Sequence, residues 1–248
     1  MNKKTFICTL IVSLLAFAQI AMADYSIQAT GGGSLNVGPW GYSDGGEFTF
    51  TTGGLDTSLY AGTTINQVST TSYGNTFQTF CVENQVVYSP GTTYSAVLSQ
   101  YSPKDSNHAL TLGAAWLYWQ FATGVLQSYD YTNTSTGRNN TAGLLQQEIW
   151  YLMGQTQAGF NPNNDVFNTL ATNAIGASNL LNASNGAFGV YVLNLYTDST
   201  HQTEVQDQLV LAGPNDEGLP APTPIPAAAW LLGSGLMGLL GLRRKQKV

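Results

Sequence analysis

The sequence contains only two cysteines, Cys8 and Cys81. Cys8 falls in a segment that is expected to be removed as a secretory leader, so Cys81 is expected to be the only cysteine of the mature chain. Secreted domains usually carry cysteines in even numbers, because their compartment oxidises them in pairs. The unpaired Cys81 leaves three interpretations: an inert buried thiol, an intermolecular disulfide or a reactive group.

Basic residues are scarce in the part of the chain that would be exported. All 14 acidic residues lie between residues 24 and 226, against only two of the 8 basic residues, Lys104 and Arg138. This part therefore has an excess of 12 negative charges. Nucleic acid and anionic membrane surfaces are poor partners for such a surface, so no nucleic-acid partner is expected.

The chain also lacks the residues of several common sites. Its histidines, His108 and His201, are too few to complete a zinc site with Cys81, and no external cofactor is expected. Calcium stays an open alternative at 161–165 and 216–217, although neither stretch has EF-hand spacing. A Cys81–His108 dyad would suit nucleophilic catalysis, but no protease signature surrounds Cys81, so an enzyme is not expected.

The first 23 residues predict a secretory signal peptide. Lys3 and Lys4 precede an apolar run from Phe6 to Ile20, and residues 21–23 supply a small-x-small cleavage site. The mature chain is therefore expected to begin at Asp24, and the protein to be exported.

The end of the chain predicts a linker and a membrane segment. Repeated prolines indicate an extended, semi-rigid linker over residues 214–226. Residues 227–242 are apolar and uncharged, and Arg243-Arg244-Lys245 follows them. This pattern predicts a single transmembrane helix within 227–248, with its basic end in the cytoplasm.

The same tail resembles a known sorting signal. Pro224, Pro226, Ala227 and Trp230, ending in Arg243-Arg244-Lys245, resemble the PEP-CTERM signal in its VPLPA-like variant, with Thr-Pro-Ile-Pro-Ala in place of a Pro-Glu-Pro box. In Gram-negative bacteria that make exopolysaccharide, exosortase handles this signal. The resemblance implies a transient anchor in the inner membrane and a final location at the cell surface or in the extracellular matrix.

Residues 24–213 predict one α+β domain that is mainly β, with a helical part at about 109–181. The expected strands cover residues 25–28, 47–51, 58–60, 76–87, 94–98, 188–196 and 205–211. The expected helices cover 109–126, 141–153 and 165–181, with Asn164 or Asp165 capping the last. Pro90-Gly91 predicts a turn that joins 76–87 and 94–98 as a hairpin, and Gly45-Gly46 is interpreted as turn punctuation.

A glutamine in the second predicted helix is a candidate partner for Cys81. On a helix, Gln146, Ile149, Trp150 and Met153 share one face. An amide on this aromatic, apolar face needs a partner, since an unpaired buried amide costs several kcal/mol. Taken alone, a glutamine at the helix edge that bonds to the sheet would explain the pattern equally well.

Two short motifs together resemble the thioester domains of bacterial surface adhesins. Residues 80–83 (F-C-V-E) match the aromatic-Cys strand motif, and residues 145–150 (L-Q-Q-E-I-W) match the helix motif that is often written TQxA. The resemblance implies a β-sandwich or barrel with a helical insertion and an internal thioester for attachment to an amine or hydroxyl of a surface or matrix partner. The implied site comprises Cys81 and Gln146, surrounded by Phe80, Glu83, Ile149 and Trp150.

The second motif departs from the family at two positions. Leu145 replaces the usual Thr, Glu148 replaces a small residue, and Gln147 is an alternative acyl donor. Two other functions stay open. One is a non-covalent module that binds polysaccharide or another matrix component, with exposed Tyr and Trp as stacking platforms. The other is a structural protein whose Cys81 forms an intermolecular disulfide.

Overall fold

A computed structural model describes residues 25–29, 35–36, 45–60, 75–89, 91–103, 107–132, 137–155, 158–213 and 216. The predicted signal peptide, the sorting segment 227–248 and most of the linker lie outside these residues. Among the described residues, no helix has both the length and the apolar character needed to cross a bilayer.

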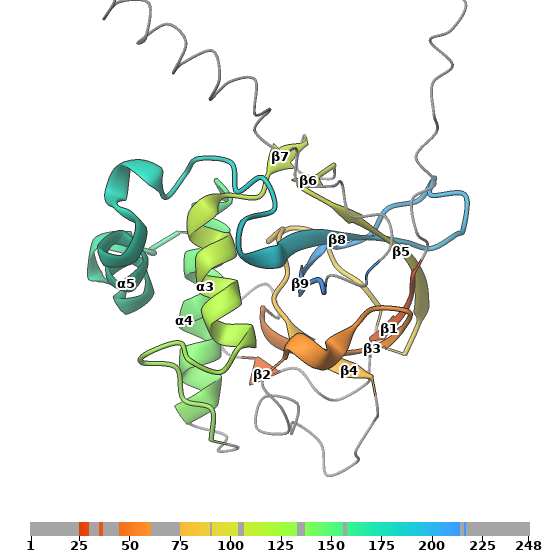
Figure 1. Cartoon of the computed structure of the whole chain (residues 1–248), viewed down its shortest axis with the longest axis horizontal. Helices are drawn as coiled ribbons and strands as arrows, with labels where there is room; N and C mark the ends of the chain where they lie inside the picture. Colours follow the sequence, from red (N-terminus) through yellow and green to blue (C-terminus); the bar gives the residue numbers. More distant parts are fainter. Residues whose placement is uncertain are drawn as a thin grey trace, which may run out of the picture. The chain divides into compact units, whose positions relative to one another are not determined.

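Seven strands form an antiparallel sheet that curves into a nearly closed barrel (Figure 1). The hydrogen-bonded order is β2-β3-β1-β5-β8-β9, and β4 also pairs with β3. The strands are β1 Tyr25–Ala29, β2 Leu35–Asn36, β3 Gly46–Gly53, β4 Thr76–Thr79, β5 Thr93–Ser99, β8 Val190–Tyr196 and β9 Gln208–Leu211. β6 Tyr101–Ser102 and β7 His108–Ala109 form a separate ribbon. The prediction of a mainly-β, barrel-like fold with helices is confirmed.

The predicted hairpin between 76–87 and 94–98 is wrong. β5 pairs with β1 and β8, whereas β4 pairs with Phe48–Thr51 of β3. β2 pairs with the first two residues of β3, Gly46 and Glu47. If the β3–β4 pairing continued, the Gly46 and Cys81 N–H groups would face the opposite strand, but both donate to the Gln146 side chain. β4 therefore ends at Thr79 and is shorter than the predicted strand.

The chain after β4 crosses to β9 and completes the ring of strands. The Leu209 N–H donates to the Phe80 carbonyl at 3.0 Å. Cys81 forms an isolated antiparallel bridge with Gln208. Cys81 therefore lies in the seam that closes the barrel, where neighbouring chain segments fix its backbone.

Three α-helices lie between β7 and β8 in the sequence: α3 Leu112–Ala122, α4 Gly137–Leu152 and α5 Val166–Ile175. α3 and α4 lie side by side next to the barrel, and α5 lies outside them (Figure 1). The Asp165 carboxylate caps α5, as one of the two predicted caps, and Gly176 ends that helix with a φ of 85°. α4 begins at Gly137, four residues before the predicted start of the second helix at residue 141.

Two further boundaries differ from the prediction. Residues 58–60 are not a strand, because Thr57–Leu59 form a 3-10 helix in which the Asp56 carboxylate accepts the Ser58 N–H at 2.9 Å. β8 begins only at Val190, since Phe188 in the preceding 3-10 turn has a φ of 61°.

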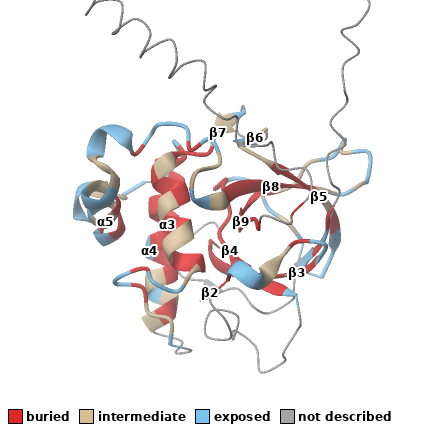
Figure 2. Cartoon of the chain, viewed as in Figure 1, coloured by how far each residue is buried: buried red, intermediate tan, exposed pale blue. Residues whose placement is uncertain are grey.

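The core lies inside the barrel and between the barrel and the helices. Figure 2 shows buried residues along the strands and α3, whereas most of α5 is exposed or half-buried. Fully buried aromatic side chains line this core at Phe50, Phe77, Phe80, Phe121 and Phe167. Each buried side chain of this size contributes about 1.5–3 kcal/mol, so the core holds α3 and α4 firmly against the sheet.

Candidate functional site

The structure places the side chain of Gln146 directly against Cys81. The Cys81 thiol donates to Gln146 Oε1 at 3.2 Å, and Gln146 Nε2 donates to the Cys81 carbonyl at 2.8 Å. Each residue is only 1% exposed. Gln147 is also buried, but its Oε1 has no hydrogen-bond partner among the described residues. The hydrogen bonds thus join Cys81 to Gln146.

Two backbone donors hold the carboxamide oxygen of Gln146. The Cys81 N–H donates to Oε1 at 3.1 Å, and the Gly46 N–H donates to the same atom at 3.3 Å. One donor comes from the seam of the barrel and the other from the start of β3. Preorganised donors of this kind stabilise negative charge that develops on an oxygen when a nucleophile adds to its carbon. The site therefore has the components of an oxyanion hole.

Gly45 allows the chain before β3 to approach α4 closely. A Cβ atom on Gly45 would lie 2.3 Å from Trp150 Cη2 and 2.9 Å from Gln146 Cγ. Both distances are well below van der Waals contact, so a side chain here would displace the indole or the glutamine. Gly45-Gly46 was interpreted as turn punctuation, and its role in close packing was missed.

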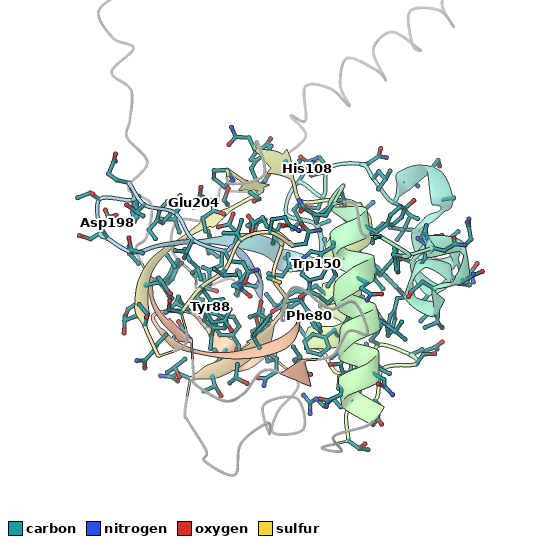
Figure 3. All side chains as sticks on the ribbon, turned by 180° about the vertical axis from the view of Figure 1, so that it is seen from behind. Phe80, Tyr88, His108, Trp150, Asp198 and Glu204 are labelled. Atoms are coloured by element: carbon teal, nitrogen blue, oxygen red, sulfur yellow. The ribbon has the colours of Figure 1, made fainter. Side chains whose placement is uncertain are left out.

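Aromatic and apolar side chains enclose the pair. Phe80 packs edge-on against Phe121 of α3, with ring centroids 4.9 Å apart. Ile149 is fully buried and Trp150 is 5% exposed. In Figure 3, Phe80 and Trp150 both lie where the barrel meets the helices. These side chains limit the access of water to the Cys81–Gln146 pair.

Cys81 is held as a thiol. Burial raises the pKa of Cys81 well above its ordinary value, and the negative charge of Glu83 raises it further. A backbone hydrogen bond and the Trp150 indole oppose these effects only in part. The indole N–H has no acceptor with regular hydrogen-bond geometry among the described residues. A reaction at Cys81 must therefore move the thiol proton as the sulfur attacks.

Glu83 belongs to a buried cluster that contains a second carboxyl group. Its carboxylate accepts the Asp207 N–H at 2.9 Å and the Ser102 hydroxyl. Burial raises the pKa of both Glu83 and Asp207, and the charge of Glu83 raises the pKa of Asp207 further. Because two adjacent buried carboxyl groups do not both ionise readily, the pair retains a proton.

A buried ion pair ties the first turns of α4 to β3. Arg138 Nε donates to Glu47 Oε2 at 2.9 Å, Nη2 donates to Oε1, and the Tyr129 hydroxyl donates to Oε2. Both charged side chains are fully buried. Burial raises the pKa of Glu47 and Arg138 opposes that shift, but three donors on two oxygens require an ionised carboxylate. Glu47 directly follows Gly46, so this pair fixes the strand that holds Gln146.

Arg138 and Glu47 were not predicted as part of the site. One sequence signal could have found them, since Arg138 is one of only two basic residues in a strongly acidic domain. A lone cation of this kind is retained in a core only with a paired carboxylate.

The remaining predicted residues carry no site in the described part of the chain. The sorting-signal residues lie outside it: Pro224, Pro226, Ala227, Trp230, Arg243, Arg244 and Lys245. Asn161 and Asp165, from the candidate calcium stretch, cap the N-termini of short helices. No three His, Cys, Asp or Glu side chains within the described ranges are grouped to hold a metal ion.

No family model, curated protein or solved structure matches the chain.

Proposed function

We propose that Cys81 and Gln146 form an internal thioester, and that the protein uses this bond to attach covalently to a partner at the cell surface or in the extracellular matrix. The observation that carries the proposal is the environment of Gln146 Oε1, which receives the Cys81 thiol, the Cys81 N–H and the Gly46 N–H. This environment supports acyl transfer, because it sets a nucleophile beside the amide carbon and donors on the amide oxygen.

Formation of the bond balances without an added reactant. Cys81 Sγ adds to Gln146 Cδ, and the negative charge that develops on Oε1 is stabilised by the two backbone N–H groups. The thiol proton passes to Nε2, the C–N bond breaks and ammonia leaves. Carboxamides are poor electrophiles, so the fixed proximity of the two side chains must supply most of the rate.

The thioester then acts as an electrophile toward the partner. An amine or hydroxyl of the partner adds to the thioester carbonyl, and the sulfur leaves and recovers a proton as the Cys81 thiol. The partner is then joined to residue 146 by an amide or ester bond. Each protein molecule reacts once, so the protein is a covalent binder and not an enzyme.

The two ends of the chain support an exported location for this reaction. The leader favours secretion, and the resemblance of the tail to an exosortase signal favours a transient anchor that is removed. We expect protein recovered from the cell surface to lack the chain from Ala227 onward. Peptide mass spectrometry tests this, and mature surface protein that still carries Arg243-Arg244-Lys245 would contradict it.

Methylamine tests the reactivity of the site. Folded protein should take up one methylamine at residue 146, and a thiol reagent added after unfolding should then label Cys81. Untreated protein should not be labelled, because its sulfur is held in the thioester. Cys81→Ala and Gln146→Ala proteins should take up no methylamine, whereas Gln147→Ala should react like the wild type. Failure of the folded wild-type protein to incorporate methylamine would refute the proposal.

A further inference from the structure

A groove of about 390 Å³ lies at the C-terminal end of α4, beside α5. The 3-10 helices Pro162–Asn164 and Ala177–Asn179 form its ends. Amide, hydroxyl and phenol groups line it: Tyr151, Asn163, Asn168, Thr169, Thr172 and Asn173. Its volume lies within the range of about 300–1,000 Å³ that is typical of small-ligand sites.

No charged side chain lines this groove, although the domain around it is strongly acidic. The nearby Glu148 is buried and accepts the Asn168 amide at 2.8 Å. Burial raises the pKa of Glu148 to about 8, so this carboxyl group is protonated at neutral pH. The groove therefore suits an uncharged ligand and offers nothing to pair with a cation or an anion.

Several polar groups of the groove are available to a ligand. The side-chain amides of Asn163 and Asn173 are exposed and form no hydrogen bond within the described part of the chain. The Thr169 hydroxyl donates to the Asp165 carbonyl at 3.1 Å, which leaves its oxygen free to accept. An amide both donates and accepts, so these groups match neighbouring hydroxyls of a ligand.

The groove also has an aromatic side chain and an apolar floor. Tyr151 is 36% exposed, and its ring packs against Phe160 with centroids 5.8 Å apart. Leu152 and Leu180 are buried beneath the polar rim. Sugar rings have apolar faces that pack on aromatic rings and hydroxyl edges that bond to amides. A peptide that binds by strand addition would instead need an open strand edge, and helices and turns form this groove.

We propose that this groove is a non-covalent site for a neutral saccharide, such as a short segment of an uncharged polysaccharide. The site requires neither Cys81 nor Gln146, so it is independent of the proposed thioester. It would hold a hydroxyl-bearing partner against the helix that carries Gln146.

Calorimetric titration of the purified full chain with neutral hexasaccharides of glucose, galactose, mannose and N-acetylglucosamine tests the site. At least one of these hexasaccharides should bind. Tyr151→Ala should weaken that binding about tenfold, the effect expected from the loss of one aromatic contact. Asn173→Ala should weaken it about three- to tenfold, as expected for one lost hydrogen bond. Tyr101→Ala and Asn140→Ala, at exposed positions outside the groove, are matched controls and should bind like the wild type.

Three results would overturn the assignment. They are no binding of any neutral hexasaccharide at millimolar concentration, equal weakening by the groove and control variants, or tighter binding of a peptide or a polyuronate. Cys81→Ala protein should bind the saccharide unchanged. Loss of methylamine uptake with retained saccharide binding would therefore refute the thioester alone, and the reverse pattern would refute the groove alone.

Discussion

Two buried acidic clusters flank the proposed thioester, and they differ in how their charge is balanced. Glu47 receives a pair of bonds from the Arg138 guanidinium and one from a tyrosine. Glu83 receives a hydroxyl and a backbone N–H, and its acidic neighbour is the carboxyl group of Asp207. The first cluster is therefore an ion pair, whereas the second is a carboxyl pair that retains a proton.

The two clusters therefore have different roles at the site. The ion pair anchors the strand whose Gly46 N–H contacts the Gln146 oxygen, so it fixes the position of that N–H group in the site. Burial keeps the Cys81 sulfur protonated until it reacts, and the negative charge of Glu83 in the carboxyl pair adds to this effect. Substitutions in the first cluster should therefore change stability and geometry, and substitutions in the second should change the response to pH.

The largest expected effect comes from removing the cation of the ion pair. Arg138→Met leaves Glu47 buried without its partner, which typically costs about 3–5 kcal/mol of unfolding free energy. Urea denaturation of the folded protein measures this cost. The double variant Glu47→Leu/Arg138→Met removes both charges and should recover most of the loss. If the double variant were as unstable as the single one, the ion pair would not be the anchor.

A smaller effect is expected where the chain before β3 meets α4. Gly45→Ala places a methyl group against Trp150 and Gln146, and overpacking of this kind costs about 1–3 kcal/mol. It should also slow thioester formation, because it displaces the acyl donor. Gly53→Ala, at the other end of the same strand, is the matched control, since its nearest contact would be an ordinary 3.6 Å. Equal effects of the two variants would contradict the close-packing role of Gly45.

The smallest expected effect, measured over one pH unit, is on the pH dependence of stability. Burial raises the pKa of Asp207, so the folded protein keeps this proton above about pH 4, where the unfolded chain releases it. The stability that the protonated group contributes is therefore present at low pH and is lost as pH rises, by up to about 1.4 kcal/mol per pH unit. The asparagine of the Asp207→Asn variant cannot ionise, so this variant should flatten that part of the decline above about pH 4.

Urea denaturation at several pH values measures the decline. Asp198→Asn is a suitable control, because Asp198 is exposed and a hydrogen bond from Thr200 lowers its pKa. This variant should leave the slope above pH 5 unchanged. An unaltered slope in Asp207→Asn would mean that the carboxyl pair holds no extra proton, and the contrast between the clusters would fail.

The elements with strong local signals could be predicted from the sequence. Helical periodicity indicated α4, and the cap of α5 was one of two adjacent polar residues, Asn164 or Asp165. The contact between Cys81 and Gln146 could be expected only because two short motifs, 65 residues apart, resembled a known pair. Periodicity alone allowed a hydrogen bond from Gln146 to any part of the sheet.

The features set by competition between distant segments could not be predicted. Glu47 and Arg138 are 91 residues apart, and Arg138 lies before the predicted start of the second helix at residue 141. The strand expected over 76–87 ends at Thr79, because Gln146 accepts the Gly46 and Cys81 N–H groups and the following residues pair with the chain around β9. The local residue pattern of 76–87 does not indicate which distant segment will pair with it.

The intact mass of the folded, exported protein tests the central claim most directly. We expect a wild-type mass one ammonia lower than the mature sequence requires. Cys81→Ala and Gln146→Ala should each have the full sequence mass, and Gln147→Ala should again lack one ammonia. A wild-type protein of full mass, with a Cys81 thiol that titrates freely after unfolding, would contradict the thioester.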